Sequence, residues 1–226
     1  MAARRSFLRI LFAPLLAACG SPPQAEPPPP ADADAPTPGE VADRRAAIVA
    51  FGDSLSAGYG VDPGQSYPDH LQKLIDAAGY PYRVINAGIS GDTTSSGLAR
   101  VDSIVAMKPA MVIVELGGND GLRGLPIETT EANLGEILVR LKASGAIVAL
   151  AAMTLPPNYG AAYIGQFERL YRHLAERHQV MLIPFFLEGI AGHPDRMQEN
   201  GIHPTEEGNR LAAANVFRAI QPLLRH

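Results

Sequence analysis

The chain contains 226 residues, 46% of them hydrophobic, and its formal net charge is −4 at pH 7. This length fits one domain of ordinary size with an appendage, and the apolar fraction is enough to form a buried core. The nearly balanced charge excludes the strong field that recruits nucleic acid, so no nucleic-acid partner is expected. The single cysteine, Cys19, excludes an intramolecular disulfide.

The N-terminus has the features of a targeting segment. Arg4 and Arg5 precede an apolar stretch at 7–16, which is shorter than the roughly 20 residues needed to span a bilayer. The stretch leads into Leu16-Ala17-Ala18-Cys19, which resembles a bacterial lipobox and predicts lipidation of Cys19. By resemblance to lipoprotein sorting, Gly20 favours the outer membrane facing the periplasm. A plain secretory signal with a chance cysteine is the alternative.

Prolines interleaved with Ala, Asp and Glu make residues 20–45 a low-complexity stretch. It has no apolar periodicity and cannot bury a core, so we predict a disordered linker. Proline-rich chain extends by roughly 3.1 Å per residue, which could hold a domain well away from a membrane. We therefore expect a lipoprotein signal peptide at 1–19, the linker at 20–45 and a folded domain at 46–226.

Short apolar runs alternate with stretches of helical periodicity throughout the folded domain. This alternation predicts an α/β fold, a three-layer α/β/α sandwich with a five-stranded parallel sheet of flavodoxin-like type. Thr205 is expected to cap the last helix. Strands are expected at 48–51, 83–85, 111–116, 146–152 and 180–183, and helices at about 67–78, 97–107, 129–144, 162–178 and 205–224.

Four short sequence blocks lie where the strand ends of such a sheet would meet. Three of them follow expected strands directly, and the fourth lies between the last strand and the last helix. Ligands bind beyond the carboxyl ends of the strands in folds of this kind, so we expect all four at one rim. The blocks are Gly52-Asp53-Ser54-Leu55, Gly88-Ile89-Ser90-Gly91-Asp92, Gly117-Gly118-Asn119-Asp120 and Gly201-Ile202-His203-Pro204.

These blocks contain the groups needed to attack an ester and to hold its oxyanion. Ser54 is placed to act as nucleophile, and His203 can take its proton as general base. Gly91 lets a backbone amide approach a ligand closely, and the Asn119 side chain can donate to an oxyanion. Read singly, each residue also fits an ordinary turn or cap. The remaining histidines lack metal-ligand spacing, so neither a metal nor a cofactor is expected.

Taken in order, the blocks resemble the SGNH, or GDSL, hydrolase family over about residues 48–226. The resemblance narrows to the bacterial thioesterase I, lysophospholipase and arylesterase branch. The segments that carry it are Gly52–Tyr59, Ser90–Thr93 and Glu115–Gly124. By contrast, the sequence around the serine is not Gly-x-Ser-x-Gly, which disfavours an α/β-hydrolase.

The resemblance implies a role for each site residue. Ser54 would be the nucleophile and His203 the base, while the amides of Ser54 and Gly91 and the side chain of Asn119 would form the oxyanion hole. A loop that resembles the border of the acyl pocket in that branch contains Pro156, Asn158 and Tyr159.

The chain departs from the family pattern at Asn200. The family usually has Asp-x-x-His, with the aspartate orienting the imidazole and stabilising its cation. In one well-studied triad, the change from Asp to Asn lowered kcat by about 10⁴. Three interpretations are open: a Ser–His dyad helped by a backbone carbonyl, a contribution from Glu199, and partial deamidation of Asn200 before Gly201 to give an aspartate.

We therefore expect a serine hydrolase that cleaves carboxylic esters or thioesters through an acyl-Ser54 intermediate. By resemblance, its substrates would be small acyl esters and lysophospholipids, and its location the cell envelope, with a membrane anchor at Cys19. One alternative is a weakly active or inactive binding module, and another is a polysaccharide O-acetyl esterase. The apolar loop at 155–164 and the lack of tryptophan favour acyl chains over sugars.

Overall fold

The computed structural model describes residues 43–226, so the predicted signal peptide, the predicted lipidation site at Cys19 and most of the predicted linker lie outside the described residues. The folded unit begins at Asp43, slightly earlier than the sequence predicts. Arg45 accounts for the difference, since its guanidinium bonds to Asp43 and lies 2.7 Å from the Asp76 carboxylate. This exposed ion pair attaches the end of the expected linker to the domain.

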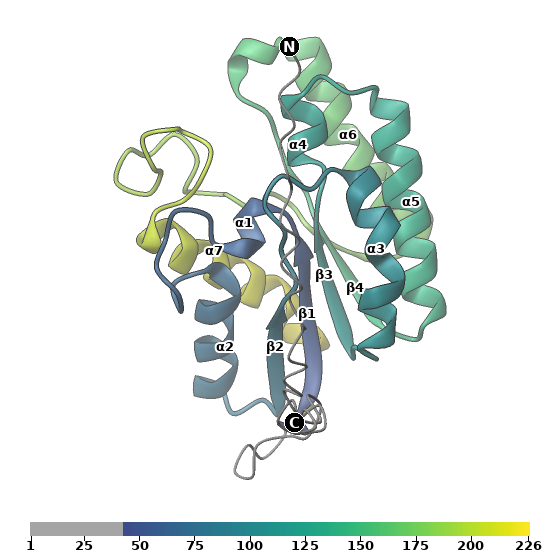
Figure 1. The fold of residues 1–226 in the computed structure, drawn as a ribbon, viewed down its shortest axis with the longest axis vertical. Helices are drawn as coiled ribbons and strands as arrows, with labels where there is room; N and C mark the ends of the chain where they lie inside the picture. The colour runs from purple at the N-terminus through teal and green to yellow at the C-terminus, as the bar shows by residue number, and fades with distance from the viewer. Residues whose placement is uncertain (1–42) are drawn as a thin grey trace, which may run out of the picture. The chain divides into compact units, whose positions relative to one another are not determined.

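Five parallel strands form one sheet in the order β2-β1-β3-β4-β5 (Figure 1). All of β3 and nearly all of β1 are buried, so both faces of the sheet need cover, which explains the continuous apolar runs in the sequence. The predicted α/β fold with a five-stranded parallel sheet is confirmed. The strands are β1 Ala46–Gly52, β2 Tyr82–Asn86, β3 Met111–Glu115, β4 Ile147–Ala151 and β5 Met181–Ile183.

Two groups of helices cover the two faces of this sheet. Helices α2 and α7 pack together on one side, α3, α5 and α6 pack on the other, and the short α1 and α4 follow the ends of β1 and β3 (Figure 1). Within residues 43–226, no helix is long and apolar enough to cross a membrane. The helices are α1 Ser54–Ala57, α2 Tyr67–Ala77, α3 Thr94–Ala106, α4 Gly118–Leu122, α5 Ile127–Ala143, α6 Ala161–His178 and α7 Glu206–Ile220, with 3₁₀ turns at Pro157–Tyr159 and Gln221–Leu223.

Two helix boundaries differ from the sequence-based prediction for identifiable reasons. Helix α3 begins earlier, at Thr94, because the side chain of Thr93 caps it. Helix α7 ends earlier, at Ile220, because Pro222 cannot donate a helical hydrogen bond and the chain continues as a 3₁₀ turn. Thr205 caps α7 as predicted, accepting a hydrogen bond from the third residue beyond it.

The close approach of α1 to the second sequence block depends on Gly88. A Cβ at this position would lie 2.7 Å from the carbonyl carbon of Ser56 and would overlap the amide nitrogen of Ala57. Both are backbone atoms, which cannot move aside as a flexible side chain can. The absence of a side chain at Gly88 therefore lets the first two blocks pack directly against each other.

We expect Gly88→Ala to lower the free energy of unfolding by about 1–3 kcal/mol, the usual cost of forcing extra volume into a packed site. Gly135→Ala is the matched control, because Gly135 lies within α5 and a Cβ there meets only ordinary contacts from 3.5 Å outward. Helix propensity should make that variant equally or slightly more stable than the parent. Thermal and urea unfolding check both variants, and an undisturbed Gly88→Ala would contradict the packing argument.

Candidate active site

Ser54 and His203 meet at the rim of the sheet, although they are 149 residues apart in the sequence. The Nε2 atom of His203 lies 2.9 Å from the Oγ atom of Ser54. This distance is within the reach that a general base needs to take a hydroxyl proton. Ser54 is the first residue of α1, directly beyond β1, and His203 lies in the loop before α7. The structure thus brings together the predicted nucleophile and the predicted base.

Asp53 fixes the short turn that carries Ser54. Its carboxylate caps α1 by accepting a hydrogen bond from the Leu55 amide at 3.0 Å. At the other end of α1, Gly58 adopts a left-handed conformation, with φ of +79°, and its amide donates to the Ser54 carbonyl. Because both ends of this four-residue helix are held, the Ser54 side chain has a defined position relative to the sheet.

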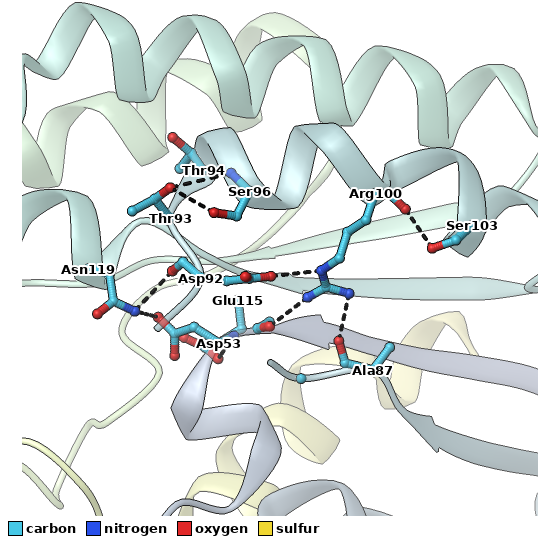
Figure 2. Close-up of polar contacts among 12 residues, drawn as sticks. Asp53, Ala87, Asp92, Thr93, Thr94, Ser96, Arg100, Ser103, Glu115 and Asn119 are labelled. Carbon is cyan, nitrogen blue, oxygen red and sulfur yellow. Dashed lines mark hydrogen bonds and ion pairs between the residues drawn. The ribbon is translucent and has the colours of Figure 1, made fainter. Parts of the chain in front are cut away.

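Asn119 links three of the four blocks through its side-chain amide. Its Nδ2 atom donates to the Asp53 carboxylate at 3.0 Å and to the Asp92 carbonyl at 2.9 Å (Figure 2). Gly91, adjacent to that carbonyl, is exposed and has a φ of +88°, which favours glycine. An oxyanion would have to share or replace one of the two acceptors of Asn119. The oxyanion-hole roles of Ser54, Gly91 and Asn119 stay predictions that this proximity supports.

Asn200 shapes the histidine loop but makes no hydrogen bond to the imidazole. Its Oδ1 atom accepts hydrogen bonds from the backbone amides of Ile202 and His203, both at 3.0 Å. Within residues 43–226, the buried Nδ1 atom of His203 has no hydrogen-bond partner. Glu199 is exposed and does not reach it, and no backbone carbonyl accepts from it. The interpretations that gave Nδ1 a carbonyl or Glu199 as partner are therefore wrong for this geometry.

The unpartnered Nδ1 atom limits His203 as a base. For Nε2 to accept the Ser54 proton, Nδ1 must carry a hydrogen, and a buried donor without an acceptor costs about 1–3 kcal/mol. Burial also lowers the pKa of His203, so the ring is neutral at pH 7, as a general base must be. However, no carboxylate stabilises the imidazolium that forms when the ring takes the proton. The pair is a Ser–His dyad rather than a complete triad.

A buried carboxyl group, Glu115, lies beneath the serine turn at the end of β3. Its Oε2 atom accepts from the Ser56 hydroxyl at 2.8 Å and from the Asp53 amide at 3.3 Å. Burial, followed by the nearby charge of Asp53, raises the pKa of Glu115 well above its usual range. Burial likewise raises the pKa of Asp53 to about 6. Sequence reasoning missed Glu115, although a carboxyl group in an otherwise apolar strand was a usable signal.

Arg100 connects the strand ends from the side of α3. Its guanidinium donates to the Asp92 carboxylate at 2.7 Å and to the carbonyls of Ala87 and Gly52 at 2.9 Å each (Figure 2). The same group lies 4.5 Å from the centre of the Phe51 ring. It therefore joins the ends of β1 and β2 to the second block. This role could not be predicted from the sequence, because nothing in a helical pattern shows which carbonyls an arginine will reach.

The predicted pocket loop lies beside the helix that carries Asn119. After β4, the Tyr159 hydroxyl donates to the Leu122 carbonyl at the end of α4, at 2.7 Å. Pro156 and Tyr159 are partly buried, whereas Asn158 is exposed. This places the loop next to the expected site, and its role in binding an acyl chain stays a prediction. Within residues 43–226, no group of three or more His, Cys, Asp or Glu side chains could hold a metal ion.

Comparisons with known proteins identify the family and agree with the fold. The GDSL-like lipase/acylhydrolase family model matches residues 50–211. Esterase TesA of Pseudomonas aeruginosa is 45% identical over 178 residues, covering 78% of this chain and 89% of that protein. Thioesterase 1/protease 1/lysophospholipase L1 of Escherichia coli is 41% identical over 180 residues, covering 79% and 85%. A crystal structure of TesA, 45% identical, matches with a TM-score of 0.77 over 79% of this chain and 99% of that chain.

The chain belongs to the GDSL-like lipase/acylhydrolase family. The resemblance to SGNH hydrolases that the four blocks carry is thereby confirmed, as is the prediction of a carboxylic ester hydrolase. The comparisons do not address the individual site residues, whose roles depend on the geometry described above.

Substitution of Glu115 by glutamine should stabilise the protein at alkaline pH. A carboxyl whose pKa is raised on folding destabilises the native state once the pH exceeds its pKa in the unfolded chain, about 4.3, because only the unfolded chain ionises freely. Glutamine removes this penalty while keeping an acceptor oxygen for the Ser56 hydroxyl. We expect the Tm of Glu115→Gln to exceed that of the parent at pH 8, with a difference that shrinks towards pH 4.

Asp102→Asn is the matched control, because the Asp102 side chain is 83% exposed. It should show no comparable gain at pH 8. Thermal unfolding between pH 4 and pH 8 measures all three proteins. A Glu115→Gln variant that is less stable than the parent by the same amount at every pH would mean that Glu115 is ionised and needed in the folded state.

Proposed function

We propose that this chain hydrolyses carboxylic esters through Ser54, activated by His203 without a carboxylate partner. The observation that carries the proposal is the 2.9 Å contact between His203 Nε2 and Ser54 Oγ. It lies where the blocks of an acylhydrolase family meet. The names of the relatives at 45% and 41% identity, an esterase and a thioesterase/lysophospholipase, support the same bond class.

In the proposed reaction, Ser54 Oγ attacks the ester carbonyl carbon while His203 Nε2 takes its proton. The resulting oxyanion faces the amides of Ser54 and Gly91 and the side chain of Asn119. Collapse of the tetrahedral intermediate breaks the carbon–oxygen bond to the leaving alcohol, which receives the proton from Nε2. Water then attacks the acyl-Ser54 ester with His203 again acting as base, and this step releases the acid and restores the serine.

Acyl esters, including lysophospholipids, are the proposed substrate class. The apolar loop at 155–164 favours an acyl chain, and its hydrogen bond to Leu122, at the end of the helix that carries Asn119, supports this role. A lipid anchor at Cys19 would hold the enzyme at the outer membrane, facing the periplasm. Acyl-CoA is scarce in that compartment, so oxygen esters are preferred over CoA thioesters in this proposal.

A binding module derived from an esterase is the second candidate. The specific observation in its favour is the buried Nδ1 atom of His203, which has no partner within residues 43–226. Such a protein would keep the acyl pocket and bind esters without turning them over. It differs from the first candidate in one measurable respect, namely the turnover of the parent chain.

We expect the parent to hydrolyse p-nitrophenyl acetate and butyrate, and Ser54→Ala to abolish this turnover. Asn200→Asp should raise kcat by at least about 10-fold, towards the 10⁴ that separates aspartate from asparagine in another triad. The added carboxylate can accept the Nδ1 hydrogen and stabilise the imidazolium. Initial rates measured with the full-length chain provide the test.

Peptide mass analysis of residue 200 is the control, because spontaneous deamidation of Asn200 would itself produce the aspartate. Activity that scales with a deamidated fraction would assign the parent rate to that fraction. Activity in undamaged protein supports the dyad. A silent parent rescued by Asn200→Asp would favour the binding module, and turnover that survives in Ser54→Ala would overturn the proposed nucleophile.

A further inference from the structure

Something other than a carboxylate must orient the His203 ring in this chain. The Oδ1 atom of Asn200 accepts from two backbone amides, and the Nδ1 atom of His203 has no hydrogen-bond partner within residues 43–226. A single hydrogen bond, between Nε2 and Ser54, does not by itself fix the rotation of the imidazole about its Cβ–Cγ bond. The faces of the ring are therefore the remaining surfaces through which it can be held.

The aromatic ring of Tyr59 covers one face of the imidazole. The two ring centroids are 4.4 Å apart and the planes are inclined by 34°. Tyr59 comes from the same turn as the nucleophile, because its amide donates to the Ser54 carbonyl at 3.0 Å. The predicted nucleophile and the ring that covers the predicted base therefore come from one hydrogen-bonded turn, in which Tyr59 is 53% exposed.

Gln198 joins the Tyr59 turn to the His203 loop. Its Nε2 atom donates to the Tyr59 carbonyl at 2.7 Å and to the Pro204 carbonyl at 2.8 Å. Its backbone amide donates to the His203 carbonyl at 2.8 Å. One side chain therefore spans the two segments whose rings stack. The hydrogen bonds of Gln198 therefore hold together the two segments that bring the Tyr59 and His203 rings into contact.

An aromatic face attracts a cation more strongly than it attracts a neutral ring. During proton transfer, His203 changes from neutral to cationic, so a stacked Tyr59 stabilises the state that the absent carboxylate would otherwise stabilise. No charged side chain among the described residues shifts the pKa of His203, which burial alone lowers. The tyrosine face is thus a local feature able to favour the imidazolium.

We propose that Tyr59 is a positioning residue that takes over part of the missing acid's role, holding the imidazole in plane and favouring its cation. The inference rests on the proposed Ser54–His203 chemistry and adds a residue to it. Tyr59 exchanges no proton: the proton still moves from Ser54 Oγ to His203 Nε2 and then to the leaving alcohol. The ring cannot accept the Nδ1 hydrogen, so it replaces the acid only in part.

The test compares Tyr59→Phe with Tyr59→Leu in the full-length chain. Both variants keep an apolar cover over His203, but only phenylalanine keeps the aromatic face. We expect Tyr59→Phe to match the parent and Tyr59→Leu to lose about 2- to 30-fold in kcat with little change in KM, the range that corresponds to a cation–π contact. The pKa of His203, followed by NMR and by the acid limb of kcat/KM, should be lower in Tyr59→Leu than in Tyr59→Phe.

Two further comparisons distinguish positioning of the His203 ring from a general effect of losing a tyrosine. Tyr80→Leu removes a similar stack, Tyr80 on His226 at 4.4 Å, and should leave kcat unchanged. In the Asn200→Asp background, the loss caused by Tyr59→Leu should shrink, because the new carboxylate supplies the same stabilisation. A loss confined to KM would make Tyr59 a substrate contact and overturn the proposal, as would equal kcat and equal His203 pKa in the leucine and phenylalanine variants.

Failure of the proposed chemistry would look different. If turnover persists in Ser54→Ala, the nucleophile assignment fails, and the kinetic comparisons no longer report on His203. The NMR titration of His203 still decides whether the Tyr59 ring favours the imidazolium, because it requires no turnover. Equal His203 pKa values in the two Tyr59 variants would then overturn the inference independently of the proposed function.

Discussion

The side-chain amide of Asn119 is the contact on which the arrangement of the site depends. By donating to the Asp53 carboxylate and to the Asp92 carbonyl, it fixes the ends of three strands relative to one another. Arg100 reinforces the same junction from α3. A parallel sheet delivers these segments to one edge, but only such polar contacts determine the spacing within that edge to the few tenths of an ångström that proton transfer requires.

Burial beneath this junction has an electrostatic consequence. Asp53 and Glu115 lie close together away from water, and the pKa values of both carboxyls are raised. Glu115 accepts hydrogen bonds from the Ser56 hydroxyl and the Asp53 amide, and its raised pKa favours the neutral form. A neutral Glu115 avoids a second negative charge under the place where the oxyanion is expected to form. The nucleophile turn therefore packs over a buried, hydrogen-bonded carboxyl group whose neutral form is favoured.

Asn200 stands where the family resemblance implies an acid, and the structure gives its side chain a different role. As an asparagine, the residue accepts two backbone amides and stabilises the loop that presents His203. The loop geometry and the contact between His203 and Ser54 persist, while the partner for Nδ1 is lost. The position of His203 and the electrostatic support of its ring are thus separate properties. Asparagine at position 200 preserves the position of His203 but supplies no acceptor for Nδ1.

The five-stranded parallel sheet and the meeting of the four blocks could be predicted from the sequence, because apolar periodicity indicates the strands and the carboxyl ends of parallel strands share an edge. The short helix α4 could not, since Gly117-Gly118-Asn119-Asp120 equally fits a turn. Nor could the side-chain contacts of Asn200, since nothing in the Asn-x-x-His spacing distinguishes an amide that faces the imidazole from one that faces the backbone. The roles of Glu115 and Arg100 depend on partners far away in the sequence.

The central claim is that Ser54 is a nucleophile activated by His203 despite the missing acid. Reaction with an alkyl fluorophosphonate tests it most directly, because this reagent traps an activated serine and requires no particular ester substrate. The account predicts one phosphonyl group per chain, located at Ser54 by peptide mass analysis, and little labelling in His203→Ala under the same conditions. Labelling at another residue, or equal labelling with and without His203, would contradict it.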